Sequence, residues 1–293
     1  MDMNTIARKD APNTVWHITS RVNWRAWHLR TEEACQVFLE CLSDSLKRFF
    51  VDLIAYVVMS NHYHAVVRSP HEEIYRELTG RRTRCRHFLP WPRRHPRSTV
   101  IGQCVRELQL SVGRRIQGEL GLTGHFWEGK HHRRRLVDKW ALVTAVAYDH
   151  RNPVVQGIAP RPEQYTRSSA AWWAGRGSSA VPLCTRPDFP FGSLEDVREH
   201  VVRFQHDKRL DDVMAVFRKS GLPIDSPKGR RYLEKLMRAA GIDPLGNEPW
   251  PEAEGCGTSS AVGEPQLVYC AWLTPATQVN RWGTYATVTS RER

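Results

Sequence analysis

Two histidines separated by one residue, His62 and His64, are the first feature of the sequence that suggests chemistry. They lie in an apolar segment, residues 53–68, whose pattern is typical of two strands joined by a short turn. Because strand side chains alternate between the two faces, His62 and His64 point the same way and Tyr63 points the other way. Two imidazoles side by side are half of a metal site, so the segment predicts a bound divalent ion.

The second chemical feature is Tyr148, which precedes Asn152 by four residues at the end of an alanine- and valine-rich helix. Residues four apart lie on one face of a helix. Asn152 can add an amide oxygen to the two histidine ligands, and Tyr148 can attack a phosphorus atom as a nucleophile. Asp149 and His150 lie beside the tyrosine on other helix faces, so neither is expected to act as its base.

Together these residues predict cleavage of a phosphodiester through a covalent phosphotyrosine, with Mg²⁺ or Mn²⁺ as the ion. The phosphotyrosine would conserve the bond energy for a later rejoining, so no ATP is needed. Taken singly, each residue also fits a structural role. A histidine pair can be satisfied by its neighbours, and a lone tyrosine is usually a surface or core residue.

The charge of the chain indicates a polyanionic partner. The 293 residues carry a formal net charge of +12 and the pI is about 9.7, which favours nucleic acid. Residues 78–106 contain no acidic side chain, and three prolines interrupt them, so we expect a basic loop over the DNA-binding face. A solvated loop that only improves solubility is the alternative. The residues expected to contact DNA are Arg81, Arg82, Arg84, Arg86, Arg93, Arg94, Arg97, Arg114, Arg115, Lys130, His131, His132, Arg133, Arg134 and Arg135.

The order of elements predicts an α+β fold in which helices pack on one face of an antiparallel sheet. Thr31 and Asp138 are expected to cap helices, and Pro153 should end its helix at Asn152. Residues 1–174 are expected to form the catalytic domain, and residues 175–293 a mostly helical C-terminal extension of unknown role. The expected strands are 14–21, 52–59, 62–68 and one within 126–137, and the expected helices are 31–49, 71–79, 100–120, 139–151, 193–219 and 226–240.

Seven scattered cysteines without a Cys-x-x-Cys pair are typical of a reducing compartment. The polar N-terminus lacks an apolar signal core, and no apolar run approaches the ~20 residues that span a bilayer. We therefore expect a soluble cytoplasmic protein that associates with the nucleoid.

Four stretches carry a resemblance to a known family: Trp16–Arg21, Met59–His64, Gly124–Glu128 and Tyr148–Val154 with Gly157 after it. In order and spacing the chain resembles, over about residues 13–172, the single-tyrosine HUH transposases, in particular the REP-associated tyrosine transposases of the IS200-like group. Two departures are Tyr63, where an aliphatic residue is commoner, and Ser60, where proline is usual.

The resemblance implies a ferredoxin-like HUH nuclease domain in which His62 and His64 bind the metal, Asn152 completes the site and Tyr148 is the nucleophile. It also implies action on single-stranded DNA beside hairpin or palindromic repeats, through a 5′-phosphotyrosine. Relatives occur as homodimers and as monomers. The sequence leaves open a domesticated relative that nicks repeats, a DNA-binding module or repressor with an inactive site, and a zinc hydrolase acting on small molecules.

Overall fold

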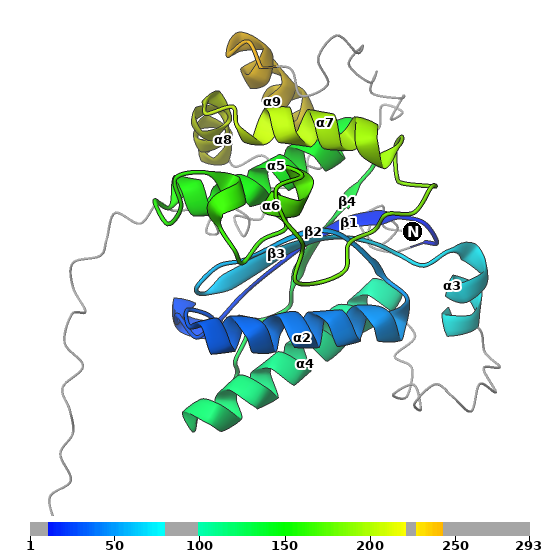
Figure 1. The fold of residues 1–293 in the computed structure, drawn as a ribbon, viewed down its shortest axis with the longest axis vertical. Helices are drawn as coiled ribbons and strands as arrows, with labels where there is room; N and C mark the ends of the chain where they lie inside the picture. The colour runs from blue at the N-terminus through cyan, green and yellow to red at the C-terminus, as the bar shows by residue number, and fades with distance from the viewer. Residues whose placement is uncertain (1–10, 80–98, 221–226, 243–293) are drawn as a thin grey trace, which may run out of the picture.

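A four-stranded antiparallel sheet forms the centre of the molecule, with helices packed against it (Figure 1). The computed structural model describes residues 11–79, 99–220 and 227–242. All strand pairs are antiparallel and the strand order is β2-β3-β1-β4, which confirms the predicted α+β class. The strands are β1 (Val15–Arg21), β2 (Asp52–Val58), β3 (His62–Arg68) and β4 (His132–Leu136).

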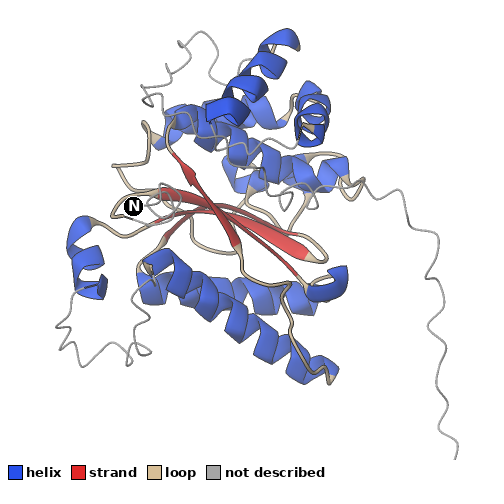
Figure 2. Ribbon diagram, turned by 180° about the vertical axis from the view of Figure 1, so that it is seen from behind, coloured by secondary structure: helices blue, strands red, loops and turns tan. Residues whose placement is uncertain are grey.

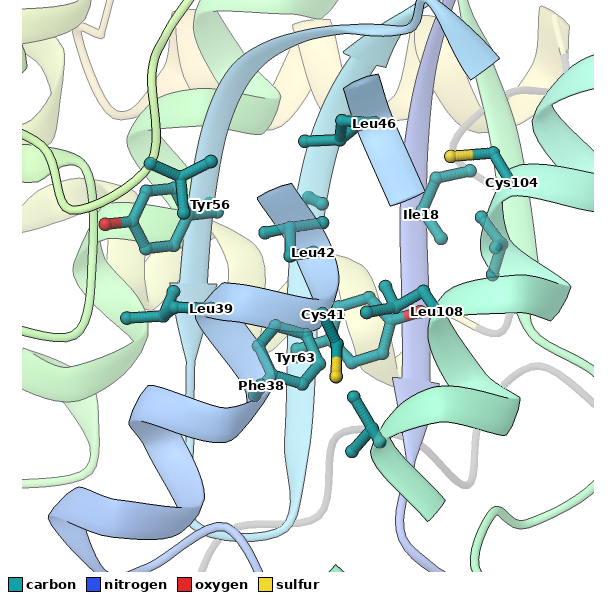
Figure 3. Packing of buried hydrophobic residues seen from close by; sticks show 14 of the residues in the cluster. Ile18, Phe38, Leu39, Cys41, Leu42, Leu46, Tyr56, Tyr63, Cys104 and Leu108 are labelled. Carbon is teal, nitrogen blue, oxygen red and sulfur yellow. The ribbon is translucent and has the colours of Figure 1, made fainter. Parts of the chain in front are cut away.

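One face of the sheet is covered by α2 (Glu32–Phe49) and α4 (Val100–Leu120). Helix α2 begins where the sequence predicted, because the Thr31 hydroxyl accepts a hydrogen bond from the Ala34 amide at 3.2 Å. Helix α4 ends at Gly121, whose φ of 63° suits a residue without a side chain. Figure 3 shows the apolar layer that α2 and α4 form with the sheet; its labelled members include Ile18, Phe38, Leu42, Tyr63 and Leu108.

A second helical layer covers the other face of the sheet, so the strands lie between two layers (Figure 2). The sequence placed helices on one face only. The difference arises from α5 (Lys139–Val155), which packs on β2 and β3 with one side and on α7 (Leu194–Gln205) with another. A helix that is apolar all round is usually buried between two partners. Helices α8 (Arg209–Lys219) and α9 (Pro227–Ala239) extend this layer, and side chains from all four helices share one apolar cluster.

Two predicted helix boundaries were wrong. Helix α5 continues through Pro153 to Val155, because Pro153 falls in the last turn and the helix is held by burial on both sides. The helix expected over 193–219 is two helices, α7 and α8, with a break at Asp207. There the Asp207 carboxylate accepts the Arg209 amide at 3.0 Å, as a capping residue does at a helix start.

Shorter elements connect the layers. They are η1 (Asn23–Arg25), α3 (Glu72–Thr79), η2 (Pro162–Gln164) and α6 (Ala170–Trp173). Most of the acid-free stretch lies outside the described residues, including Arg81, Arg82, Arg84, Arg86, Arg93, Arg94 and Arg97. Among the helices that the structure describes, none combines the length and apolar character needed to cross a bilayer.

Candidate active site

The strand register gathers polar side chains on the sheet face that α5 covers. Thr19 lies opposite His64 and Arg21 lies opposite His62 in the β1–β3 pair. Residues directly opposite in an antiparallel pair point to the same face. His62 and His64 therefore share this face, with ring centroids 5.2 Å apart. Tyr63 points to the opposite face, where it is buried against Phe38.

Helix α5 brings Tyr148 to the histidine pair. The centroids of the Tyr148 and His64 rings are 6.2 Å apart and the rings are nearly perpendicular. Tyr148 is partly exposed, whereas its neighbours on the helix are buried. Asn152 follows one turn later and its side-chain amide donates to the Tyr148 carbonyl at 3.4 Å. The predicted nucleophile and the predicted histidine ligands are thus adjacent in space, although about 85 residues of sequence separate them.

A buried carboxylate lies directly behind this pair. Asp149 Oδ1 is 3.0 Å from His17 Nε2 and 3.2 Å from His64 Nδ1, and none of these three side chains is more than 9% exposed. The His17 and His64 rings stack with their centroids 5.4 Å apart. Burial opposes ionisation of Asp149, but the two imidazoles outweigh it and hold the pKa of this carboxyl below its usual range. The carboxylate is therefore the charged acceptor of the cluster.

The carboxylate determines which nitrogen of His64 is available. The Asp149 carboxylate can only accept, so the proton on His64 resides on Nδ1, which faces it. The Nε2 atom of His64 then keeps a lone pair for a ligand. This is the arrangement in which a carboxylate orients a metal-binding histidine from behind.

Asn61 orients His62 in the same way. Its amide nitrogen donates to the Arg25 carbonyl at 3.2 Å, which turns its oxygen toward His62 Nδ1 at 2.7 Å. His62 Nδ1 must donate to that oxygen, so His62 Nε2 also keeps its lone pair. The pKa of His62 lies well below its ordinary value because of burial and the neighbouring His64 and Arg21, which keeps the ring neutral near pH 7.

These residues fit a divalent ion in either of two ways. The nitrogen atoms of His17 and His64 and an oxygen of Asp149 lie within 4.8 Å of one another, close enough to surround one ion. The other carboxylate oxygen of Asp149 is buried and has no hydrogen-bond partner among the described residues. Alternatively the Nε2 atoms of His62 and His64 hold the ion, and Asp149 and His17 support it. Imidazole and carboxylate donors suit Mn²⁺ and related ions in both arrangements.

Comparison with known proteins finds likenesses of fold only. No protein-family model matches the sequence, and no curated protein matches it. One similar solved structure is a REP-associated tyrosine transposase bound to a REP hairpin, with 16% identity and a TM-score of 0.43 over 58% of this chain and 84% of that chain. A second is a candidate transposase from Deinococcus radiodurans R1, with 14% identity and a TM-score of 0.30 over 46% of this chain and 88% of that chain. Likenesses of this extent do not assign a function, so the function is inferred from the residues of the site.

The remaining predicted DNA contacts are spread over different surfaces. Arg114 and Arg115 are exposed on α4, across the sheet from the histidine pair, and Arg115 pairs with Glu40 at 2.9 Å. On β4, His132 and Arg134 lie opposite Thr19 and His17 and so share the face of the site.

Other basic residues of the β4 region occupy different positions. Arg133 and Arg135 point to the face that α4 covers, where Arg133 donates to Thr99 Oγ1 at 2.6 Å and lies over the Trp16 ring. Lys130 is exposed, whereas the pKa of His131 falls to about 4 because burial and nearby cations disfavour its charged form.

Sequence reasoning missed His17 and Asp149. It set Asp149 aside because it does not share a helix face with Tyr148, and that is true, but Asp149 contacts His64 rather than the tyrosine. A usable signal was present. An aspartate in an alanine- and valine-rich helix is costly to bury without a partner, and His17 is a polar residue two places before Thr19 on the same face of the expected strand.

Proposed function

We propose that the protein cleaves and rejoins single-stranded DNA through a covalent bond to Tyr148. The observation that supports this most is the position of a partly exposed phenol beside two histidines whose Nδ1 atoms are both engaged. That arrangement presents a nucleophile and two ligand atoms on one face. The strongly basic chain suits a polyanionic substrate.

His62 and His64 would hold the ion, and Asn152 would complete the site. This placement is preferred to the His17–His64–Asp149 cluster because that cluster is buried and His62 is partly exposed, so a phosphate can reach an ion at His62 but not one inside the cluster. A divalent ion bound there would supply Lewis-acid polarisation of a phosphate oxygen. Asp149 keeps His64 in the Nδ1-protonated form, with His17 as its second donor, and Asn61 does the same for His62.

Tyr148 forms the new covalent bond. Its phenolic oxygen bonds to phosphorus, its proton passes to solvent, and the P–O3′ bond breaks. The 3′ oxygen leaves and takes a proton, which gives a 5′-phosphotyrosine and a free 3′ hydroxyl. Attack by a 3′ hydroxyl on the phosphotyrosine reverses these steps, restores a phosphodiester and returns the phenol. Bond energy is conserved, so the same site can join a different strand.

The natural substrate is proposed to be single-stranded DNA next to a hairpin or palindromic repeat. Residues 1–174 would form the nuclease unit, to which α7–α9 add a cover over α5. Transposition, and nicking of repeats by a domesticated relative that does not mobilise itself, share this chemistry.

Covalent adduct formation tests the proposal. The protein is incubated with Mn²⁺ and end-labelled single-stranded hairpins, and adducts are detected by denaturing electrophoresis. Tyr148→Phe should abolish the adduct and keep DNA binding, because only the nucleophilic oxygen is lost. Tyr63→Phe is the matched control, since this buried ring faces away from the site and should form the adduct normally. An adduct that persists in Tyr148→Phe would refute the assignment of the nucleophile.

Metal binding by single variants distinguishes the two ion placements. If His62 and His64 hold the ion, His62→Ala removes Mn²⁺ binding measured by calorimetry, whereas His17→Ala only weakens it. If the buried cluster holds the ion, His17→Ala removes Mn²⁺ binding and His62→Ala only weakens it. A protein that binds DNA normally but binds no metal and forms no covalent adduct would instead be a DNA-binding module.

A further inference from the structure

Two tryptophans on the segment after β1 are exposed beside the candidate site. Trp24 is 89% exposed and Trp27 is 57% exposed. A single exposed apolar side chain is normal on a protein surface, but two large indoles within four residues form an uncommon local patch. Exposed patches of this kind usually mark binding surfaces, so the two tryptophans are a candidate binding site.

The segment that carries them, residues 22–30, is held firmly. The Val22 amide donates to the Asn61 carbonyl at 2.8 Å and the Leu29 amide donates to the Ser60 carbonyl at 2.9 Å. Leu29 is completely buried in the core under α2. The exposed indoles are therefore mounted on an anchored loop and not on a loose end.

The backbone of this loop adopts a conformation that side chains disfavour. Trp24 and Arg25 have φ values of 56° and 55°, in the left-handed region that favours glycine. Conformations of this kind persist where surrounding structure enforces them and often where function uses them. Here the Arg25 carbonyl is the acceptor for Asn61, the residue that orients His62. The strained turn is thus linked to the site by two hydrogen bonds.

The charges around the patch suit a nucleic acid. Arg25 and Arg30 are exposed on the same segment. Burial and then the neighbouring Arg25 lower the pKa of Arg21, and burial, His64 and Arg21 lower that of His62, so Arg21 lies between the loop and the site. No acidic residue occurs between residues 11 and 31. Aromatic rings set among arginines are the usual means of holding single strands, in which unpaired bases stack on the rings and cations meet the phosphates.

From these observations we infer that Trp24 and Trp27 form a stacking platform for unpaired bases of single-stranded DNA that flank the phosphate held at His62 and Tyr148. The inference rests on the proposed function for the position of that phosphate. It assigns to the platform the capture of the strand, which is separate from its cleavage. Stacking tolerates any base, so the platform adds affinity and positions the strand without reading its sequence.

Equilibrium binding without cleavage tests the platform. Affinity for a labelled oligothymidine is measured by fluorescence anisotropy with chelator present and in a Tyr148→Phe background. Losing one stacked base should weaken binding roughly 5- to 150-fold, so Trp24→Ala and Trp27→Ala should each lie in that range. Trp24→Phe should recover most of the affinity. The salt slope should stay the same, because no phosphate contact is removed.

An abasic oligonucleotide makes the test specific. The wild type should bind it more weakly than oligothymidine, whereas the Trp24→Ala/Trp27→Ala variant should bind both alike. Equal binding of the two oligonucleotides by the wild type would overturn the platform. Unchanged binding by the double variant would also overturn it. A double variant that binds DNA normally but dissociates from dimer to monomer would overturn it as well, because the tryptophans would then contact a second copy of the chain.

The backbone strain provides a control against misfolding. Trp24→Gly relieves the positive φ and removes an exposed ring, so it should keep or raise the melting temperature while lowering DNA affinity. Phe191→Gly is matched to it, because Phe191 is also an exposed aromatic residue with a φ of 63° but lies on the segment before α7. That variant should keep full DNA affinity. A Trp24→Gly protein that melts lower would mark the tryptophan as structural and overturn the inference.

The platform and the proposed function can fail separately. Loss of binding in the tryptophan variants together with no adduct in the wild type would keep the platform and refute the chemistry. Normal adduct formation by the wild type, with undiminished binding in the tryptophan variants, would keep the proposed chemistry and refute the platform.

Discussion

The two faces of the central sheet are built from the same strands, yet in the described part of the chain only one of them combines its apolar cluster with a group of buried polar side chains. Toward α2 and α4, strand β3 presents Tyr63 to an apolar layer (Figure 3). Toward α5, the same strand presents His62 and His64, and Tyr148 and Asp149 of the helix contact His64. Both faces carry an apolar cluster that stabilises the fold. The α5 face alone adds these buried polar groups, which would be costly without partners.

The comparison shows how the site is separated from the core. Because side chains alternate at every residue, a strand can serve both faces without compromise. The polar face is supported from above by α5, which is buried between the sheet and α7. The C-terminal helices therefore contribute to the layer in which the site lies, although they carry none of its residues.

The largest effect is expected from removing the ion or a ligand on the polar face. Chelator, or His64→Ala, should reduce adduct formation by orders of magnitude, because the Lewis acid is lost. The melting temperature in chelator should fall only by the contribution of ion binding to the folded state, and the apolar core should stay folded. Measured rates and melting curves test this. Undiminished cleavage in excess chelator would contradict it.

A truncation on the apolar face should have the opposite profile. Leu42 is buried under the sheet, and Leu42→Ala should destabilise the fold by about 2–5 kcal/mol, because it removes buried methyl groups and leaves a cavity. The folded fraction should still form the adduct at the normal rate. Urea titration gives the stability, and rates are normalised to folded protein. A selective loss of rate would show that the two faces are coupled.

Much of this contrast follows from the sequence, and part of it does not. The alternation around His62 and His64 and the helix turn from Tyr148 to Asn152 are local patterns, and the Thr31 and Asp138 caps were found in the same way. The roles of these site residues stay predictions. Asp149 and His17 could not be paired from sequence because their contact spans 132 residues. The second helical layer was missed for a related reason, since a helix apolar all round does not indicate which neighbour covers it.

A smaller effect is expected from the carboxylate behind the histidine pair. Asp149→Asn preserves volume but replaces the charged acceptor, so His64 is no longer fixed with its proton on Nδ1. Mn²⁺ affinity should fall about 10- to 100-fold, as it does when groups that orient metal ligands are changed. Calorimetry measures the affinity, and ¹⁵N NMR of the metal-free protein should show His64 losing its single tautomer. Unchanged affinity together with an unchanged tautomer would remove Asp149 from the site.

The smallest effect is expected from Tyr63→Phe, which tests the apolar face at the residue between the two histidines. The Tyr63 hydroxyl is buried and has no hydrogen-bond partner among the described residues, and burial raises the pKa of the phenol. Removing an unsatisfied buried hydroxyl relieves its desolvation cost, so the variant should be as stable as the wild type or more stable by up to about 1–3 kcal/mol. Metal affinity and adduct formation should not change, because the ring lies on the other side of the strand. Urea titration beside calorimetry makes the measurement. A loss of metal affinity in Tyr63→Phe would show that the separation between the two faces of β3 is incomplete.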